Sequence, residues 1–385
     1  MIAVESVISS EKRELLVRDT LLRDTYVKID LCAISHNMKN IKAMAGDAVD
    51  VMAVIKADGY GHGSVKIART LMESGASCLA VATLSEALEL RFHYRDYPIF
   101  ILGHTPDRLL ELAVKNDIMQ TIFSAAQAKI LSDIARTLGV KARVHIKVDT
   151  GFHRLGTQSV DEIVRICSFE HLDVEGIFSH LALAGDEENE LQYRKFTDII
   201  SEAELRGYSF RYRHIADSIA CVDYPQYHMN MIRPGALLYG LRGYHKGSID
   251  VRQALSFVSH ISQIHHVKKG EGAGYDYIWR APFDTRIATI PFGYADGYPR
   301  SMNRGGYVTI RGVKCPVIGI ICMDQCMADI SDVPEAQEGD MAMIYGDGSE
   351  NTMSIDEAAR IAGTNKNEIV SRISARPPRI YHTGI

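Results

Sequence analysis

Short apolar runs alternate with longer stretches of helical periodicity through the first two thirds of the chain. The predicted strands are residues 51–55, 78–83, 99–103, 119–123, 143–148, 174–179, 213–216 and 232–239. The stretches between them carry apolar residues at helical spacing, as in residues 64–74, 84–91, 125–138 and 190–206. About eight strand–helix units within about 200–250 residues predict a (β/α)8 barrel, in which chemistry gathers at the carboxyl ends of the strands.

After about residue 255 the pattern changes to strands separated by turn residues. The predicted strands are residues 287–292, 307–311, 315–322 and 341–345. Ser354 and Glu357 form a capping-box pattern that predicts a short helix ending at Gly363, and residues 366–373 predict another. We therefore expect three parts, an α/β barrel followed by a mainly β domain: a charged leader or linker (1–25), the barrel (26–255) and the C-terminal β domain (256–385).

Composition excludes several classes of partner. A net charge of −5 and 24% charged residues give no sign of nucleic-acid binding. No run approaches the ~20 apolar residues of a membrane span, and the first 25 residues are too charged for a signal peptide. The seven cysteines are scattered, which favours reduced thiols. Cys322 and Cys326 could instead be metal ligands, but the sequence has no second pair of cysteines with the spacing of a zinc site. We expect a cytoplasmic protein, or the cytoplasmic part of a membrane-anchored one, that itself makes no membrane contact.

Lys56 ends the apolar run at residues 51–55 and opens a turn that contains Gly59, Gly61 and Gly63. Glycines allow tight turning and close backbone approach to a ligand. Desolvation at a strand end lowers the pKa of a lysine, so that more of it is the neutral amine that condenses with an aldehyde such as pyridoxal 5′-phosphate. The alternative is a lysine whose stem covers the core while its ammonium reaches water.

Other polar residues also follow predicted strands. They are the turn at residues 149–154, His180, the turn at residues 214–218 and the turn at residues 233–236. In a barrel these segments would meet Lys56 at one mouth. Because several polar segments would meet there, we favour a cofactor-binding role for Lys56 over a lysine that only covers the core.

Several motifs, in order, resemble the alanine racemase family of pyridoxal phosphate enzymes of fold type III, over nearly the full length from Tyr26. They are Ala53-Val-Ile-Lys-Ala-Asp-Gly-Tyr-Gly-His-Gly63, Lys147-Val-Asp-Thr-Gly-Phe-His-Arg-Leu-Gly156, Arg233-Pro-Gly, Gly274-Tyr275, Gly293-Tyr-Ala-Asp-Gly-Tyr298 and Cys322-Met-Asp324. The resemblance implies a racemase that supplies D-amino acids for peptidoglycan precursors. It also implies a homodimer with the active site at the interface.

By this resemblance Lys56 and Tyr275 are the two catalytic acid/base groups. Racemisation needs groups on opposite faces of the α-carbon, because one base that returns the proton to its own side regenerates the starting enantiomer. Both groups have reference pKa values near 10 and need shifts toward neutrality to act as acid and base. Tyr275 would come from the neighbouring subunit, and Tyr277 is the rival tyrosine.

The resemblance also implies a set of cofactor contacts. Arg233 would face the pyridine nitrogen, His180 and His214 would pack around the cofactor, and Tyr60 and Ser218 would bind its phosphate with the N–H groups of Gly235 and Ala236. Each histidine could equally be a hydrogen-bonded core residue, and Ser218 could be a helix N-cap. Arg233 could instead be a surface arginine at the turn before Pro234.

For the amino-acid substrate, the resemblance implies contacts from Arg154 to the carboxylate and from the Met323 N–H on the other subunit. Tyr294 would narrow the entrance. Lys147 matches a position that is often carbamylated in the family, where the added negative charge would position Arg154. Core packing remains an alternative for the Met323 side chain.

The sequence departs from the family pattern at Asn367, where a tyrosine is usual. A carboxamide enlarges the pocket and can hydrogen-bond a hydroxyl, so serine becomes a plausible substrate beside alanine. Asn367 resembles the racemase domain of membrane serine racemases linked to vancomycin resistance, and the leader could then be a linker to a membrane portion. The alternatives are a strict alanine racemase, a non-catalytic pyridoxal phosphate homeostasis protein and a barrel-type amino-acid decarboxylase.

Overall fold

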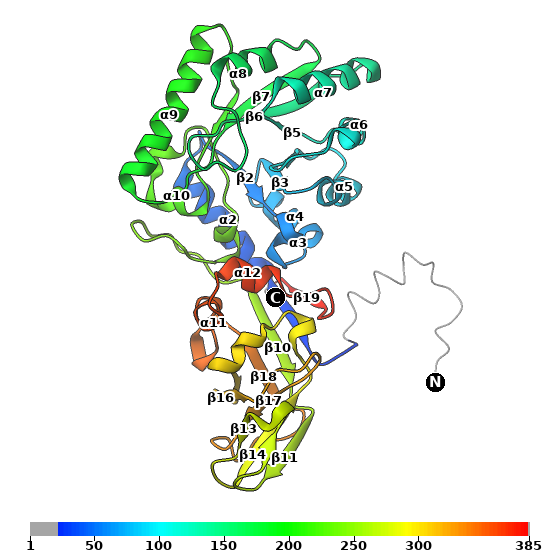
Figure 1. Ribbon diagram of the computed structural model, residues 1–385, viewed down its shortest axis with the longest axis vertical. Coiled ribbons are helices and arrows are strands. Elements are labelled where there is room, and N and C mark those ends of the chain that lie inside the picture. Colours follow the sequence, from blue (N-terminus) through cyan, green and yellow to red (C-terminus); the bar gives the residue numbers. More distant parts are fainter. Residues whose placement is uncertain (1–21, 384–385) are drawn as a thin grey trace, which may run out of the picture. The chain divides into compact units, whose positions relative to one another are not determined.

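The structure is a computed structural model that describes residues 22–383, which divide into two compact units. The first unit is Ala33–Arg252. The second unit takes both ends of the chain, residues 22–32 and 253–383. In Figure 1 the first unit runs in colour from blue to green and the second mainly from yellow to red.

Eight parallel strands form a barrel in the first unit. They are β2 (Asp50–Val54), β3 (Cys78–Val81), β4 (Ile99–Ile101), β5 (Gln120–Ile122), β6 (Ala142–Lys147), β7 (Leu172–Phe178), β8 (Tyr212–His214) and β9 (Met231–Ile232). Four of them form one set of hydrogen-bonded neighbours in the order β4-β3-β2-β9, and the other four form a second set in the order β5-β6-β7-β8. A bridge between Phe100 and Met119 joins the two sets, and the Arg233 N–H donates to the Ala216 carbonyl (3.0 Å), which closes the ring. The predicted barrel is confirmed.

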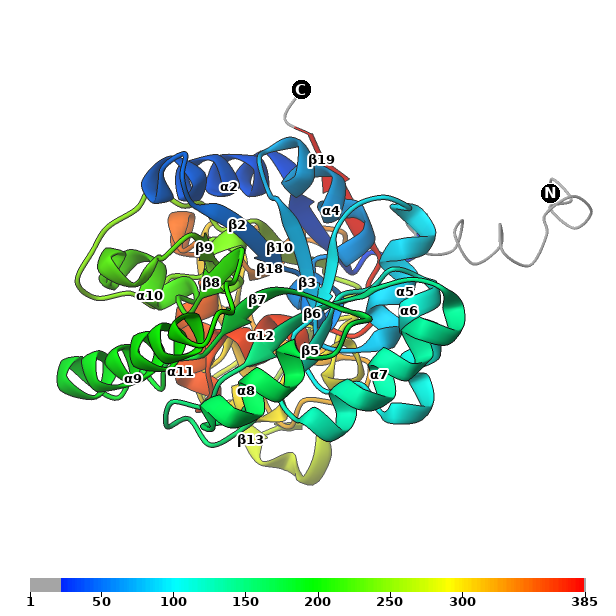
Figure 2. The same cartoon turned by 90° about the horizontal axis from the view of Figure 1, so that it is seen from above.

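Helices follow the strands around the barrel, as Figure 2 shows for α4 to α9. They are α2 (Leu31–Ala45), α4 (Ser64–Glu73), α5 (Leu84–His93), α6 (Leu110–Lys115), α7 (Ala125–Leu138), α8 (Val160–Cys167), α9 (Asp186–Leu205) and α10 (Ser218–Asp223), while the short α3 (Lys56–Tyr60) is a turn with left-handed backbone. α7 has the predicted bounds because the Ser124 hydroxyl caps its start by accepting from the Gln127 N–H (3.2 Å), and Gly139 ends it in a left-handed conformation.

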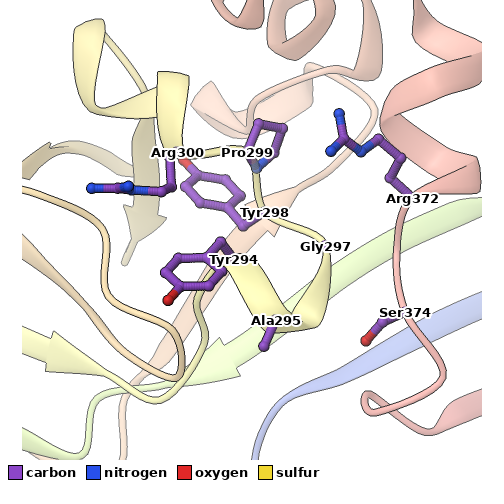
Figure 3. Close-up of a pocket in the computed structure, with 8 residues that line it drawn as sticks. All are labelled: Tyr294, Ala295, Gly297, Tyr298, Pro299, Arg300, Arg372 and Ser374. Carbon is purple, nitrogen blue, oxygen red and sulfur yellow. The ribbon is translucent and has the colours of Figure 1, made fainter.

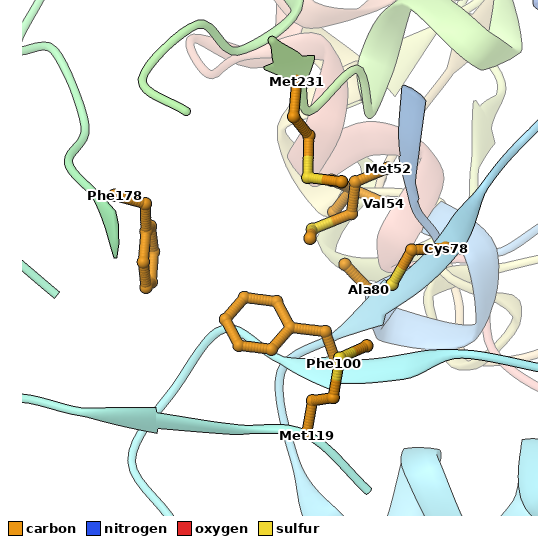
Figure 4. Close-up of a cluster of buried hydrophobic side chains, with 8 residues drawn as sticks. All are labelled: Met52, Val54, Cys78, Ala80, Phe100, Met119, Phe178 and Met231. Carbon is orange, nitrogen blue, oxygen red and sulfur yellow. The ribbon is translucent and has the colours of Figure 1, made fainter. Parts of the chain in front are cut away.

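Side chains from alternate strand positions fill the barrel interior, as Figure 4 shows. The buried cluster comprises Met52, Val54, Cys78, Ala80, Phe100, Met119, Phe178 and Met231. Met52 and Val54 share a face because side chains alternate along a strand. The barrel interior is therefore packed with side chains.

The second unit is mainly β, as predicted. Its sheet has nine strands in the order β11 (Gln263–Val267), β14 (Thr285–Ile290), β17 (Cys326–Asp329), β16 (Val313–Ile318), β15 (Tyr307–Ile310), β18 (Met341–Tyr345), β10 (Leu255–His260), β1 (Tyr26–Asp30) and β19 (Arg379–His382). A hairpin of β12 (Gly272–Ala273) and β13 (Trp279–Arg280) and the helices α11 (Ile355–Ala362) and α12 (Lys366–Ser371) complete it. Ser354 caps α11 and Gly363 ends it, as the sequence predicts.

Three expectations need correction. β1 lies in the second unit rather than the barrel, because it pairs with β10 and β19. In the leader, residues 22–25 are part of the second unit: the Thr25 hydroxyl is 2.7 Å from that of Ser259, and Arg23 bonds to Asp296. Residues 1–21 of the leader lie outside the described residues. The strand predicted at residues 232–239 ends at Ile232, because Pro234 has no N–H for a ladder; η3 (Ala236–Tyr239) is a 3-10 turn.

Candidate active site at the barrel mouth

Lys56 stands at the carboxyl end of β2. The Ile55 N–H still donates to the Ala80 carbonyl (2.8 Å), so strand pairing persists up to the residue before Lys56. Burial lowers the pKa of the Lys56 amine, and the positive charges of Arg154 and Arg233 lower it further. The pKa of Lys56 is therefore lowered in the direction that the sequence predicts.

Arg233 is buried in the same mouth, just beyond β9. Its guanidinium donates to the Ser179 carbonyl (2.7 Å), the Ile215 carbonyl (3.1 Å) and the His214 Nδ1 (2.8 Å). Burial lowers the pKa of Arg233 to about 10, which leaves it charged at neutral pH. It is thus a fixed cation rather than the surface arginine of the alternative reading.

His214 is held neutral and in one tautomer. Burial and the charge of Arg233 keep its pKa well below the ordinary value. Because arginine can only donate, Nδ1 of His214 is the acceptor, and Nε2 carries the hydrogen that faces the His145 Nδ1 at 2.8 Å. The ring stacks on Phe178 with centroids 4.9 Å apart. Sequence reasoning missed His145, because it lies inside β6 and not in a turn.

Ser218, Gly235 and Tyr60 meet at one corner of the mouth. The Ser218 hydroxyl accepts hydrogen bonds from the N–H of Gly235 (2.8 Å) and of Leu237 (3.2 Å). A Cβ at residue 235 would lie 2.7 Å from the Tyr60 hydroxyl oxygen, so only glycine permits this close approach. Burial raises the pKa of Tyr60 to about 12, which keeps its hydroxyl a donor.

Ser218 is not the N-cap of α10, as one reading of the sequence had it. Asp217 caps the helix by accepting from the N–H of Ile219 (3.1 Å) and Ala220 (3.0 Å). Ser218 is the first helical residue, so its hydroxyl is available to the turn that contains Gly235. Ala236, at the start of η3, is the next residue of that turn.

Lys147, Arg154 and His180 lie on the neighbouring strands and turns. Lys147 is buried with its amine 4.4 Å from the centre of the Phe178 ring, and burial beside Arg233 lowers its pKa well below the ordinary value. His180 has its pKa lowered to about 2 by burial and by nearby cations, Arg233 first. Arg154 is exposed and its guanidinium stacks 4.3 Å from the Phe152 ring.

The remaining predicted residues belong to the second unit. Tyr275 begins the 3-10 turn η4 (Tyr275–Tyr277) between β12 and β13, and 63% of it is exposed. The Tyr277 ring is nearly as exposed, at 58%, but it packs against Gly272 and lies 5.6 Å from the Arg280 guanidinium. These contacts of the rival ring favour Tyr275 as the tyrosine that could reach a ligand.

Tyr294 and Met323 lie on two turns that are joined through their backbones. The Tyr294 N–H donates to the Cys322 carbonyl (3.1 Å), and the Ala295 N–H donates to the Met323 carbonyl (3.0 Å). A Cβ at Gly293 would lie 2.3 Å from the Cys322 carbonyl oxygen, so the turns approach this closely only with glycine there. The side chains of Tyr294 and Met323 are both exposed.

A pocket of about 430 Å³ lies within the second unit. Figure 3 shows Tyr294 and Arg300 on one side of it and Arg372 and Ser374 on the other. Asn367 is exposed on α12, the helix that ends just before Arg372. Asn365, not Asn367, caps that helix by accepting from the Glu368 N–H (3.0 Å).

A parallel barrel with a desolvated lysine at one strand end and fixed cations around it is the arrangement of an enzyme that holds an anionic aldehyde cofactor. Comparison with known proteins makes this specific. The family profile "Alanine racemase, N-terminal domain" matches residues 29–243, and "Alanine racemase, C-terminal domain" matches residues 254–381. The chain belongs to the alanine racemase family.

Individual relatives agree over nearly the whole length. The alanine racemase of Clostridium tetani is 38% identical over 94% of this chain and 96% of its own. That of Desulfovibrio desulfuricans is 39% identical over 93% of this chain and 98% of its own. The solved structure of the Clostridium difficile 630 alanine racemase has a TM-score of 0.90 at 33% identity and covers 95% of this chain and 97% of its own. The Bacillus anthracis enzyme, solved with bound L-Ala-P, has a TM-score of 0.89 at 31% identity and covers 95% of this chain and 96% of its own.

The family is pyridoxal phosphate-dependent, so the predicted cofactor is confirmed at the level of the family. The residues at the barrel mouth fit that group. The Ser218 and Tyr60 hydroxyls could donate to a phosphate, joined by the N–H groups of Gly235 and Leu237 once these turn from the Ser218 hydroxyl that now accepts from them, and the buried guanidinium of Arg233 supplies a fixed cation. Within residues 22–383, no helix is long and apolar enough to span a membrane.

Proposed function

We propose that this pyridoxal phosphate-dependent racemase interconverts L- and D-alanine. The observation that carries the proposal is Lys56, which is partly buried at the end of β2, where desolvation and the nearby cations Arg154 and Arg233 lower the pKa of its amine. The names of the full-length relatives support alanine as the substrate, rather than the serine that Asn367 favours. A strict alanine racemase is therefore the better interpretation.

In this mechanism Lys56 and Tyr275 move the proton on opposite faces of the α-carbon. Bound pyridoxal phosphate would withdraw electrons from the amino acid and so acidify its α-proton. Lys56, with its lowered pKa, takes or returns the proton on one face. The Tyr275 hydroxyl serves the other face, and Arg233 stays a cation beside the cofactor because its pKa remains about 10.

Tyr275 would come from a second copy of the chain. Exposed apolar side chains lie around η4 and on the two joined turns of the second unit: Tyr275, Tyr277, Ile278 and Phe283, then Tyr294 and Met323. Exposed apolar groups of this kind mark interaction sites in many proteins. They support a homodimer in which the barrel mouth of one copy receives this surface from the other, with Tyr294 narrowing the entrance.

Arg154 and the Met323 N–H would bind the substrate carboxylate, and His180 would pack beside the cofactor. The exposed guanidinium of Arg154 supports its role, because it can swing toward an anion without breaking an ion pair. Carbamylation of Lys147 is supported by its burial, since the lowered pKa leaves a larger share of the neutral amine that can react with carbon dioxide. The product would be an anion that positions Arg154.

The test is chiral analysis of the products formed from L-alanine by the holoprotein, together with borohydride reduction and peptide mapping. We expect racemic alanine and a reduced cofactor bound to Lys56. Tyr275→Phe should lower kcat by about 10²-fold or more, as loss of a positioned acid/base group does. A reduced cofactor on another lysine, or undiminished racemisation by Tyr275→Phe, would contradict the proposed roles.

Serine is a second candidate substrate because of Asn367. Its carboxamide is exposed on α12 and is not the helix cap, so it can bind a substrate hydroxyl. If serine is a substrate, Asn367→Tyr should lower the serine-to-alanine ratio of kcat/KM by about tenfold or more. An unchanged ratio in the variant would rule out a role of Asn367 in serine recognition, and alanine would remain the proposed substrate.

A further inference from the structure

The backbone after Lys56 adopts a conformation that its own residues do not favour. Ala57, Asp58, Gly59 and Tyr60 all have φ between 51° and 61°, and three of the four are not glycine. A left-handed conformation costs roughly 1–2 kcal/mol for an ordinary residue. Such a turn persists only where surrounding contacts hold it, and strained turns of this kind occur at functional sites.

Most of the contacts that hold this turn are local. The Gly59 N–H donates to the Ile55 carbonyl (2.8 Å), and the Ser64 N–H donates to the Asp58 carboxylate (2.8 Å). At Ala57, where the left-handed run begins, the N–H donates instead to the Glu86 Oε1 at 2.6 Å. The first strained residue is thus held by a side chain from another element, the helix α5.

Glu86 joins the ends of two neighbouring strands. While its Oε1 accepts from Ala57 after β2, its Oε2 accepts from the N–H of Ala82 (2.8 Å) and Thr83 (3.1 Å) after β3. Three donors converge on one carboxylate, which is a group that only accepts. Among the carboxylates, Glu86 has the largest effect on the pKa of Lys56, where its charge opposes the lowering of that pKa by burial and by Arg154.

We propose that Glu86 is a positioning residue for Lys56: its carboxylate pins the left-handed turn at Ala57 and so holds the cofactor lysine at the end of β2. This inference rests on the proposed role of Lys56. The Thr83-x-x-Glu86 pattern explains only a helix start, in which Thr83 accepts from the Glu86 N–H (3.4 Å). The contact with Ala57 is a further role of the same side chain.

Glu86→Gln tests the proposal with little change in shape. The carboxamide of glutamine has one acceptor oxygen, and its NH2 group would face N–H donors on the other side. Either Ala57, or Ala82 and Thr83 together, would therefore lose the hydrogen-bond acceptor. Glu86→Asp is the second variant, because its shorter carboxylate cannot span both ends. Thr83→Ala is the matched control: it removes the cap of the same helix and leaves Glu86 facing Ala57.

Two measurements on the holoprotein decide the question. We expect both Glu86 variants to release the cofactor to hydroxylamine roughly ten- to a hundredfold faster than wild type, since small misplacements of reacting groups have effects of that size. Amide hydrogen exchange at residues 56–63 should also quicken, while Thr83→Ala stays close to wild type in both. Wild-type behaviour of both Glu86 variants, or an equal defect in Thr83→Ala, would overturn the proposal.

The two proposals fail in different ways. If borohydride fixes the cofactor to a residue other than Lys56, the proposed function is wrong whatever Glu86 does. The exchange at residues 56–63 reports on the turn itself and does not depend on which residue binds the cofactor. Should Glu86→Gln fail to fold, Glu86→Asp carries the same two readouts with the charge retained.

Discussion

A single methyl group added at Gly235 should weaken cofactor binding. In Gly235→Ala the Cβ would lie 2.7 Å from the Tyr60 hydroxyl oxygen and 3.4 Å from the Val54 Cβ, so the tyrosine must move. Overpacking of this kind costs about 1–3 kcal/mol, so we expect the cofactor Kd to rise about five- to a hundredfold. Titration of the cofactor-free chain with pyridoxal phosphate, followed by absorbance, measures it.

Gly243→Ala is the control for this prediction. Its Cβ would meet only Ile219 side-chain atoms at 3.4 Å, and Gly243 lies beyond η3. We expect its cofactor affinity to match the wild type. Equal affinity in Gly235→Ala and the wild type would show that the turn after Arg233 does not bind the phosphate of the cofactor.

Lys147 should make stability depend on pH. Burial beside Arg233 holds the pKa of Lys147 in the folded chain well below the ordinary 10.5. At a pH between the lowered pKa of the folded chain and 10.5, the unfolded chain therefore binds more protons than the folded chain. The free energy of unfolding therefore rises with pH across that window, by up to about 1.4 kcal/mol per unit, and is lowest below it.

Lys147→Met removes the amine but keeps a similar length, so it should flatten this pH dependence and raise stability at neutral pH. Urea unfolding of both cofactor-free proteins, in carbon dioxide-free buffer at neutral pH and about two units higher, compares the slopes. A carbon dioxide-free buffer matters because a carbamate would carry no titrating amine. Parallel slopes would mean that Lys147 is hydrated in solution.

At the scale of elements, the short segment before β1 should contribute to stability. Arg23 donates to the fully buried carboxylate of Asp296 at 2.6 Å and to the Pro291 carbonyl at 2.6 Å. In Arg23→Ala, the cation that residues 22–383 still place near this carboxylate is Arg376, at 3.7 Å. We expect a loss of about 1–3 kcal/mol in the free energy of unfolding, measured with urea.

The control for Arg23 is Arg360→Ala. Arg360 is 73% exposed and 4.0 Å from Glu357, and a surface pair of this kind contributes at most about 0.5 kcal/mol. If both variants lose the same small amount, Asp296 must find another partner when Arg23 is gone.

The elements that the sequence predicted well are those whose signals are local. α7 has its predicted bounds because Ser124 and Gly139 mark its ends, and residues 51–55 are apolar because β2 is buried on both faces. β1 was placed in the wrong unit because its partners, β10 and β19, lie more than 200 residues away in sequence. Pairing over such distances leaves no local signal.

The same limit applies to the candidate site. The sequence put Lys56, Arg233 and Gly235 at one mouth, because each follows a predicted strand and parallel strands end on one side of a barrel. It did not indicate Glu86, since a capping box accounts for that residue within its own helix. It did not indicate His145 either, because an inward-facing histidine in a strand has the spacing of any core residue.

At the scale of the whole molecule, the assignment of Lys56 and Tyr275 to different copies predicts complementation between two inactive variants. Lys56 belongs to the barrel unit and Tyr275 to the second unit. In a heterodimer of Lys56→Ala and Tyr275→Phe chains, one site receives both substitutions and the other receives neither. Random pairing makes half of the dimers mixed, so co-expression should restore about a quarter of the wild-type alanine racemase activity. If each copy used its own tyrosine, every site would carry one substitution and the mixture would stay as inactive as its parts, which a chiral assay of the co-purified dimers distinguishes.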